Sequence, residues 1–398
     1  STKIDLTKCK FSNLQSPIVG NCAFYECNKI VISDFQISNY IGDYSFYNCN
    51  EVNFNVYLRS DLNYLGEFAF YGCKNIKSIE MTNCDNLISI KKSCFEGCIS
   101  ISGNLWLSRN IKRIEEKAFC GCSSINDISI SEEVEYIGSK AFCNCSSCTK
   151  LGIYSEIENS KLKVIEDGAF YGCSKISGDL VIPKKVEFIG SEAFYNCAGF
   201  TSLSLSQNIL TNISYRAFYG CSGLLGSLTF NKEMKIIDSY SFTNCRGFNG
   251  VLTFESTIER IGDYSFSNTN FSKVYYHGSD EPKCSHSIGF PEEMVIQVDD
   301  NYQQNRFCGY EIFTHKTSHP VIESSFYSYD LDSHSLEPVT PTNEPHNHKK
   351  LGKGAIIAIS ISCIAFVSAV GVCAFIYIRN HYLKQPGVNP SSLLISSD

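Results

Sequence analysis

The stretch Ile165-Glu-Asp-Gly-Ala-Phe170-Tyr-Gly-Cys173 decides how this chain folds, because its pattern recurs eleven times. The pattern is an apolar residue, Gly or a polar residue, two variable positions, a small residue, Phe, two further residues and usually Cys. Successive phenylalanines are separated by 22 to 28 residues, and most often by 24. A fixed period of this length predicts a solenoid of stacked repeats. The phenylalanines are Phe24, Phe46, Phe70, Phe95, Phe119, Phe142, Phe170, Phe194, Phe218, Phe242 and Phe266.

A second phrase, a short alternating apolar pair, lies between the Phe blocks. Alternation with a period of two predicts a strand with one buried face. Each repeat should therefore supply one short strand, a turn and a looser return that carries the Phe. Stacked strands would lie about 4.8 Å apart. The pairs are Ile79-Glu-Met81, Leu105-Trp-Leu107, Ile128-Ser-Ile130, Leu180-Val-Ile182, Leu203-Ser-Leu205, Leu228-Thr-Phe230 and Leu252-Thr-Phe254.

These phrases resemble a known family. The pattern I-G-x-x-A-F-x-x-C, with a following L-x-L-P as in Leu180-Val-Ile-Pro183, is similar to the BspA-type leucine-rich repeats. The resemblance covers about Val19 to Ile312, and Val295 to Ile312 is similar to the family's closing cap. It implies an α/β-type leucine-rich-repeat solenoid of about eleven repeats of 24 residues, with one short strand per repeat. It also implies a surface antigen or adhesin of bacteria or protists. The ectodomain is then 1–313, with the cap at about 271–313.

The repeated Phe is expected to form a buried spine, since burial of one Phe stabilises by about 1.5–3 kcal/mol. The Cys of each phrase is expected to be a free buried thiol that packs as a small hydrophobe. Equivalent side chains of stacked repeats point in parallel, which argues against a disulfide ladder, and the spacing does not match a zinc site. Cys284 and Cys308 lie outside this column and are the disulfide candidate. The repeat cysteines are Cys27, Cys49, Cys73, Cys98, Cys122, Cys145, Cys173, Cys197, Cys221 and Cys245.

The middle residue of each strand pair should face outward, and this column is the hypothesis for a ligand surface. Aromatic residues with a polar handle are enriched in binding hot spots, and the column carries the single Trp of the chain. The alternative is an ordinary solvated sheet face. A longer repeat at Leu151 to Ser160 predicts a bulge, either a recognition loop or a tolerated insertion. The column is Glu80, Trp106, Ser129, Gly152, Val181, Ser204, Thr229, Thr253 and Tyr275.

The sequence favours binding over catalysis. All eight histidines lie at or after His277, so the repeats offer no base for a Ser–His or Cys–His nucleophile. Phosphate-loop, dinucleotide and metalloprotease motifs are missing from the sequence. We therefore expect no enzyme, no cofactor and no metal site. A net charge of -7 also argues against nucleic acid as a partner.

The C-terminal quarter of the chain changes character. Residues 314–350 are rich in Pro, Ser, Thr and His and predict a flexible stalk. Residues 355–378 carry no charge and are long enough to cross a hydrocarbon core of roughly 30 Å. Small residues in this span allow weak self-association. The tail, 379–398, is too short for a domain.

Topology is inferred from architecture, because lysines and arginines flank both sides of the span. Adhesive repeats beside a stalk suit the exterior, which predicts a single-pass plasma-membrane protein with a cytoplasmic tail. Asn144, Asn212 and Asn270 each begin an N-x-S glycosylation sequon.

The tail contains two incomplete sorting signals. Asn389-Pro390 resembles an NPxY signal with Ser in place of Tyr, and Leu393-Leu394 resembles a dileucine signal without its acidic residue. Three functions stay open. The first is a surface adhesin for protein or glycan ligands on host cells, microbes or matrix. The second is an endocytic or sensing receptor, and the third is a structural coat antigen.

Overall fold

The computed structural model describes residues 4–5, 18–27, 30–31, 35–37, 39–52, 55–153, 159–284 and 286–314. All belong to the first of two compact units, Ser1–Ile322. The predicted membrane span, the tail and the stalk beyond Thr314 lie outside the described residues. Within the described part, no helix is long and apolar enough to cross a membrane.

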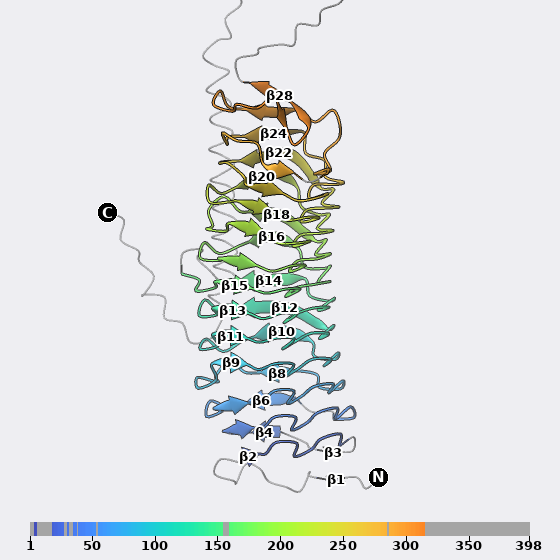
Figure 1. Cartoon of the computed structure of the whole chain (residues 1–398). Coiled ribbons are helices and arrows are strands. Elements are labelled where there is room, and N and C mark those ends of the chain that lie inside the picture. Colours follow the sequence, from blue (N-terminus) through green and yellow to red (C-terminus); the bar gives the residue numbers. More distant parts are fainter. Residues whose placement is uncertain are drawn as a thin grey trace, which may run out of the picture. The chain divides into compact units, whose positions relative to one another are not determined.

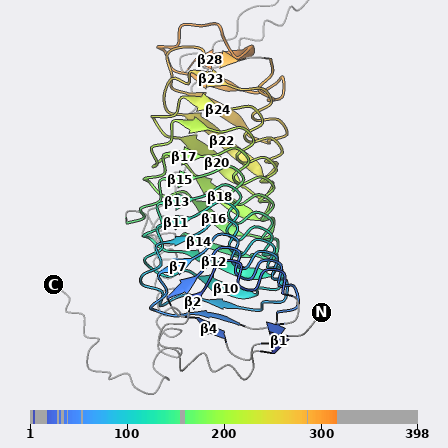
Figure 2. The ribbon, with the colours of Figure 1, turned by 60° about the horizontal axis from the view of Figure 1, so that its bottom comes forward.

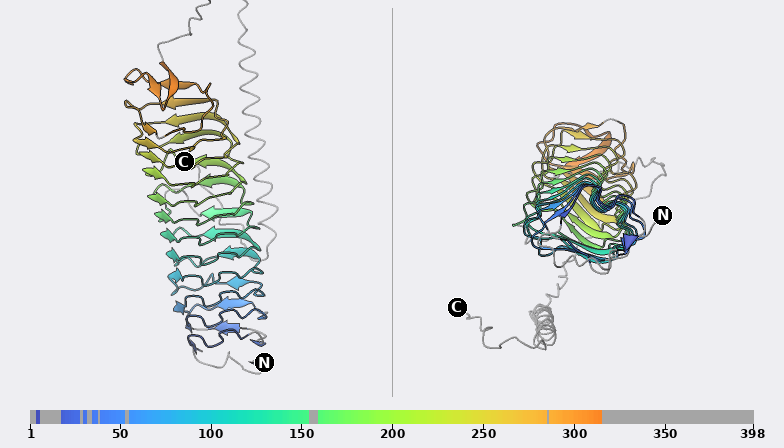
Figure 3. Two further views of the ribbon diagram at one scale, coloured as in Figure 1. Left: turned by 45° about the vertical axis from the view of Figure 1, so that its right-hand side comes forward. Right: turned by 90° about the horizontal axis from the view of Figure 1, so that it is seen from below.

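Each turn of the solenoid contributes two strands to two parallel ladders (Figures 1 and 3). Strands of three to seven residues, together with the two-residue β8, form what we call the long-strand face, and they lie above one another in Figure 2. They are β4 (Phe35–Ile37), β6 (Val56–Leu58), β8 (Ile79–Glu80), β10 (Gly103–Trp106), β12 (Ile125–Ile130), β14 (Lys150–Ile153), β16 (Gly178–Val181), β18 (Phe200–Ser204), β20 (Gly226–Phe230), β22 (Phe248–Phe254), β24 (Lys273–Tyr276), β26 (Ile296–Val298) and β28 (Tyr310–Thr314).

The second ladder, the short-strand face, is built from strands of two residues. They are β2 (Ile18–Val19), β5 (Tyr40–Ile41), β7 (Tyr64–Leu65), β9 (Ser89–Ile90), β11 (Arg113–Ile114), β13 (Tyr136–Ile137), β15 (Val164–Ile165), β17 (Phe188–Ile189), β19 (Asn212–Ile213), β21 (Ile236–Ile237), β23 (Arg260–Ile261) and β25 (Lys283–Cys284). At the N-terminal end, β1 (Ile4–Asp5) pairs with β3 (Ile30–Val31). Each short strand from β2 to β23 ends on the apolar residue that opens a Phe phrase, as Ile165 does in β15.

Two sequence-based expectations are wrong. The repeats contain strands and turns but no helix in the described residues, so the α/β-type repeat is not what forms. Each repeat also has two strands rather than one. The return that carries the Phe is a series of turns, held by backbone bonds between neighbouring repeats; Phe170 N–H donates to Ala193 O at 2.8 Å. These inter-repeat bonds satisfy backbone groups that a helix would have satisfied internally.

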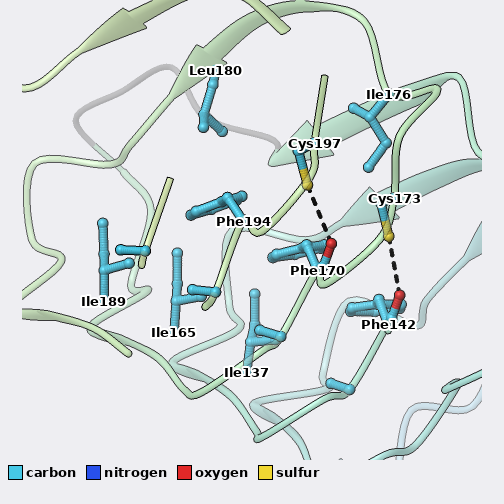
Figure 4. Packing of buried hydrophobic residues seen from close by; sticks show 14 of the residues in the cluster. Ile137, Phe142, Ile165, Phe170, Cys173, Ile176, Leu180, Ile189, Phe194 and Cys197 are labelled. Carbon is cyan, nitrogen blue, oxygen red and sulfur yellow. Dashed lines mark hydrogen bonds between the residues drawn. The ribbon is translucent and has the colours of Figure 1, made fainter. Parts of the chain in front are cut away.

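The predicted Phe spine is confirmed. Rings from Phe24 to Phe266 stack in one column with successive centroids 5.0–5.7 Å apart, and Phe290 extends it at 5.2 Å. All but Phe24, which is half-buried, are fully enclosed up to Phe266. Figure 4 shows part of this column beside the isoleucines that end β13, β15 and β17. The core is therefore a repeated layer in which each spine Phe rests on its equivalent in the next turn.

The stacking continues through β24, β26 and β28, in the segment expected to form the cap. There β28 pairs parallel with β26 and antiparallel with β27 (Arg306–Phe307). This antiparallel pair differs from the all-parallel ladders before it. A change of strand direction stops the open edge from accepting another repeat in register.

Candidate functional site

The repeat cysteines are structural. From Cys49 to Cys245 they are free and buried, as predicted, whereas Cys27 at the first turn is half-buried. From Cys49 onward, each thiol donates a hydrogen bond of 2.9–3.4 Å to the carbonyl oxygen of the spine Phe one turn earlier. Burial raises the pKa of Cys98 and Cys245 well above the ordinary 9.0, so these thiols stay protonated. A protonated, enclosed thiol is a poor nucleophile and a poor metal ligand.

Two disulfides lie at other positions. The structure joins Cys284 to Cys308, the pair singled out from the sequence. It also joins Cys120 to Cys143, which the sequence analysis missed. The repeat cysteines are free, as expected, but stacked equivalents at this other phrase position do form a bridge. Each of the two cysteines directly follows a spine Phe, and their Cα atoms lie 4.6 Å apart, which is within reach of a bridge. In the sequence, a Cys directly follows the spine Phe in two consecutive repeats, and this pattern could have indicated the bridge.

The predicted ligand column does follow one register on the long-strand face. Trp106 pairs with Ser129 and Ser129 with Gly152. The other printed pairs are Val181 with Ser204, and Thr229 with Thr253 and then Tyr275. The same register places Tyr57 beside Glu80, and Gln297 and Phe313 beyond Tyr275; the sequence analysis missed these three.

Exposure along this column is uneven. Glu80, Trp106, Val181 and Ser204 are exposed, and Trp106 at 45 % is the largest exposed side chain in the predicted set. Ser129, Gly152, Thr229, Thr253 and Tyr275 are half-buried. The column is therefore not a uniform sheet face, and its most prominent feature is the tryptophan.

A hollow of about 850 Å³ opens beside Trp106. Two features of the sequence coincide with it. The residues that follow Trp106 in register, Ser129 and Gly152, are small. On the other side, the connection from β8 to β9 spans residues 81–88 and is longer than the 107–112 and 131–135 connections that follow it. The lining residues are Thr82, Asn83, Asp85, Trp106, Leu107, Arg109, Ser129, Ser131, Glu132 and Glu133.

Several polar side chains line this hollow and are available for further hydrogen bonds. Within the described part of the chain, the side chains of Asn83, Asp85, Arg109 and Glu132 have no hydrogen-bond or ion-pair partner. Glu133 is paired with Lys161, at 2.7 Å between Oε2 and Nζ. Three carboxylates and one guanidinium thus line the same hollow as one aromatic ring. Such a mixture of an aromatic surface and convergent polar groups is typical of a ligand site.

Comparison with known families decides the identity of the repeats. The model of the BspA type leucine-rich repeat region matches in six copies, over residues 2–103, 39–176 and 163–281. The chain belongs to this family. The BspA-type repeats thus account for most of the described solenoid. No curated protein matches the chain.

Three solved structures are similar to the BspA-type chain at 18% identity. A leucine-rich cell surface protein from Faecalibacterium prausnitzii matches with a TM-score of 0.42 over 73% of this chain and 84% of that one. A leucine-rich repeat protein from Bacteroides ovatus matches with a TM-score of 0.37 over 76% and 93%. The pneumococcal vaccine antigen PcpA matches with a TM-score of 0.36 over 72% and 75%.

The sequons of the BspA-type repeats lie in different environments. Asn144 and Asn270 are exposed, and the Asn270 amide donates to the carbonyl oxygen of Arg246. Asn212 is half-buried in β19. Glycosylation at these positions stays a prediction. The tail residues Asn389, Pro390, Leu393 and Leu394 lie outside the described residues. No cluster of metal-ligating side chains is found in the part of the chain that the structure describes.

The BspA-type turns also carry two tyrosine ladders that the sequence analysis missed; Tyr25 is exposed and the other five tyrosines are half-buried. Each tyrosine directly follows a spine Phe, and neighbouring rings stack at 4.7–4.9 Å. The position was visible in the sequence, where Tyr recurs after Phe. The Cys120–Cys143 disulfide occupies the same column between the two ladders. The ladders are Tyr25, Tyr47 and Tyr71, and Tyr171, Tyr195 and Tyr219.

Proposed function

We propose that this chain is a cell-surface binding protein that contacts its partner with the long-strand face, around Trp106. The observation that carries the proposal is the hollow of about 850 Å³ at Trp106, with four polar side chains that have no partner in the described part of the chain. Aromatic anchors in concave, partly desolvated positions contribute most of the affinity of typical interfaces. Membership of the BspA-type family supports a place at the cell surface.

The proposal is one of binding without catalysis. Within the described residues, the groups at Trp106 include carboxylates, an amide and a guanidinium but no histidine, and the repeats before His277 contain none. Burial raises the pKa of Cys98 and Cys245 well above its ordinary value, and these protonated, enclosed thiols are poor nucleophiles. The partner is a protein or glycan on host cells, microbes or matrix, and nucleic acid is disfavoured by the net charge of -7.

The proposed topology places the BspA-type repeats outside the cell. The uncharged run 355–378 would anchor the chain in the plasma membrane, with 314–350 as spacer and 379–398 inside. Surface labelling of intact cells that express the full chain tests this arrangement. Labelling of the repeats without permeabilisation is expected, and labelling only after permeabilisation would contradict it.

Binding is tested with the full chain on the surface of expressing cells, offered host cells, microbes and matrix. We expect capture of at least one of these, lost with Trp106→Ala and retained with Phe188→Ala, an exposed position on the short-strand face outside the hollow. Retained capture by Trp106→Ala would place the contact elsewhere. No capture at all would favour a structural coat. Deletion of 385–398 separates adhesion, which should survive it, from receptor uptake, which should not.

A further inference from the structure

One column of the solenoid, the position directly after each spine Phe, brings side chains of neighbouring turns within reach of a covalent bond. The Cys120–Cys143 disulfide lies in this column, with 4.6 Å between its Cα atoms. The backbone holds the two turns together here, because the N–H of Gly121 donates to the carbonyl oxygen of Cys143 at 2.7 Å. The column can therefore carry a cross-link between turns wherever its residues are able to form one.

The next two turns carry tyrosine in this column. The N–H of Gly172 donates to the carbonyl oxygen of Tyr195 at 2.8 Å, which is the equivalent of the backbone bond at the disulfide. The rings of Tyr171 and Tyr195 stack with their centroids 4.7 Å apart and an angle of 4° between their planes. The backbone thus holds two phenols side by side in the way that it holds the two cysteines.

The two rings lie at the surface over a closely packed layer. Both tyrosines are half-buried, so an oxidant can approach part of each ring, and the rings have space to slide over each other. Phe170 and Phe194 directly precede them, are fully buried and stack at 5.4 Å, which fixes the two backbones relative to each other. Groups held together in this way react as an intramolecular pair, and this favours coupling within the chain over coupling between chains.

The third ring of this ladder is held differently. Tyr219 stacks on Tyr195 at 4.8 Å, but its hydroxyl oxygen accepts a hydrogen bond from the side-chain amide of Asn244 at 3.0 Å. The guanidinium of Arg216 lies 5.7 Å from the centroid of the Tyr219 ring. A donor at the oxygen and a positive charge beside the ring both oppose the loss of an electron. Of the two stacked pairs, Tyr171 with Tyr195 is therefore the more easily oxidised.

We propose that Tyr171 and Tyr195 form a modification site, at which a one-electron oxidant joins the two phenol rings by a carbon–carbon bond. Each phenol gives up one electron and one proton, and the two radicals join at carbons adjacent to those that carry the hydroxyl groups. The hydrogen on each of these carbons then moves to the phenol oxygen, so both hydroxyl groups are restored. With a haem peroxidase and hydrogen peroxide as the oxidant, one peroxide is reduced to two waters. The inference is independent of the proposed binding function.

Such a bond would reinforce the array next to the disulfide. Cys120–Cys143 joins the turns that begin at β11 and β13, and the tyrosine bond would join the turns that begin at β15 and β17. Because each turn of a solenoid contacts mainly its neighbours, a covalent bond stabilises the turns that it joins. Amide exchange in β15 and β17 should therefore be slower in the cross-linked chain than in the untreated chain.

The test oxidises the full chain with a haem peroxidase and hydrogen peroxide, after the exposed thiol of Cys22 has been alkylated. Tryptic digestion places Tyr171 on peptide 164–175 and Tyr195 on peptide 186–216. We expect these two peptides to be recovered joined, two hydrogen atoms lighter than their sum and with the blue fluorescence of dityrosine. The oxidised chains should stay monomeric on a denaturing gel. Coupling confined to other tyrosines, bonds only between chains, or no coupling at all overturns the inference.

Variants assign the bond to the two residues. Tyr195→Phe keeps the ring and removes the hydroxyl, so the joined peptide should be lost, and Tyr171→Phe should have the same effect. Peptide 186–216 also contains Tyr215, which remains in both variants and so cannot account for their loss of the bond. Tyr136→Phe is the matched control, because the Tyr136 ring is half-buried and lies against Arg113 at 3.9 Å on the short-strand face.

The control variant should form the joined peptide as the unaltered chain does. A joined peptide from Tyr195→Phe, or its loss from Tyr136→Phe, overturns the inference. Oxidation of the unaltered chain in urea separates the effect of the fold from that of the residues, because unfolding removes the stack. We expect the joined peptide to be lost in urea, and an equal yield from folded and unfolded chains would also overturn the inference.

Discussion

The Sγ of Cys197 donates a hydrogen bond to the carbonyl oxygen of Phe170 one turn earlier, at 3.2 Å (Figure 4). The same oxygen accepts the N–H of Cys173 at 3.2 Å. The thiol thus fills the second acceptor position of a buried carbonyl, and it links two turns at the level of the spine. Apolar packing alone does not explain a Cys at this position, because Ala or Val would pack without a donor.

Cys197→Ala should lower the free energy of unfolding by about 1–3 kcal/mol, because it removes a buried sulfur and leaves part of the Phe170 carbonyl unsatisfied. Urea unfolding followed by circular dichroism measures the change. Cys22→Ala at an exposed thiol is the matched control and should stay within about 0.5 kcal/mol of the unaltered chain. Equal effects of the two substitutions would mean that the thiol bond contributes nothing.

Stability should fall at alkaline pH. Burial raises the pKa of Cys221 from 9.0 to about 12. Because the folded state holds this proton more tightly than the unfolded chain, the stabilisation is complete below pH 9 and is lost as pH rises toward 12. Cys84 behaves alike, with its pKa also raised to about 12 by burial. The urea midpoint should therefore decrease as pH rises from about 9 toward 12. A midpoint that stays constant over that range would contradict the prediction.

Phe170→Ala should cost about 3–5 kcal/mol, since a fully buried ring that stacks on Phe142 and Phe194 is replaced by a cavity. Phe188→Ala provides the control, because Phe188 is 39 % exposed on the short-strand face and should change stability far less. Unfolding in urea with both variants measures the difference. A loss as large for Phe188 as for Phe170 would show that the spine does not dominate the core.

The features that could be predicted from sequence are those that repeat. The Phe spine, the thiol column and the outward register through Trp106 all follow from one period, because equivalent residues of a solenoid rest on each other. The short strands escaped prediction because two residues such as Val164–Ile165 cannot show an alternation. The expected helix came from the family resemblance and not from any periodicity of 3.6.

The features that could not be predicted are those that depend on one place in the array. The hollow is lined by Trp106, by Ser129, which follows it in register, and by residues of the long connection 81–88. The sequence does not show that polar side chains from separate connections, such as Asp85, Arg109 and Glu132, line one hollow. To predict the Cys120–Cys143 disulfide, the distance between these two particular turns must be known, and the repeat period gives only an average distance.

The two disulfides should differ in what they stabilise. Each connects cysteines 23 or 24 residues apart, and a closed loop of that length contributes about 3 kcal/mol by chain entropy. Cys284–Cys308 joins β25 to the turn before β28, at the end of the array, whereas Cys120–Cys143 lies between interior turns. In a solenoid each turn contacts mainly its neighbours, so stability is local.

We therefore expect Cys284→Ser with Cys308→Ser to increase amide exchange in β26 and β28 and to leave β10 to β18 protected. Cys120→Ser with Cys143→Ser should act at β11 to β15, where turns on both sides still hold the strands in place. Hydrogen exchange of the full chain, resolved by peptide, distinguishes the two patterns. Uniform acceleration over the whole array by either pair would mean that the solenoid unfolds as one cooperative unit, and the local account of its stability would then be wrong.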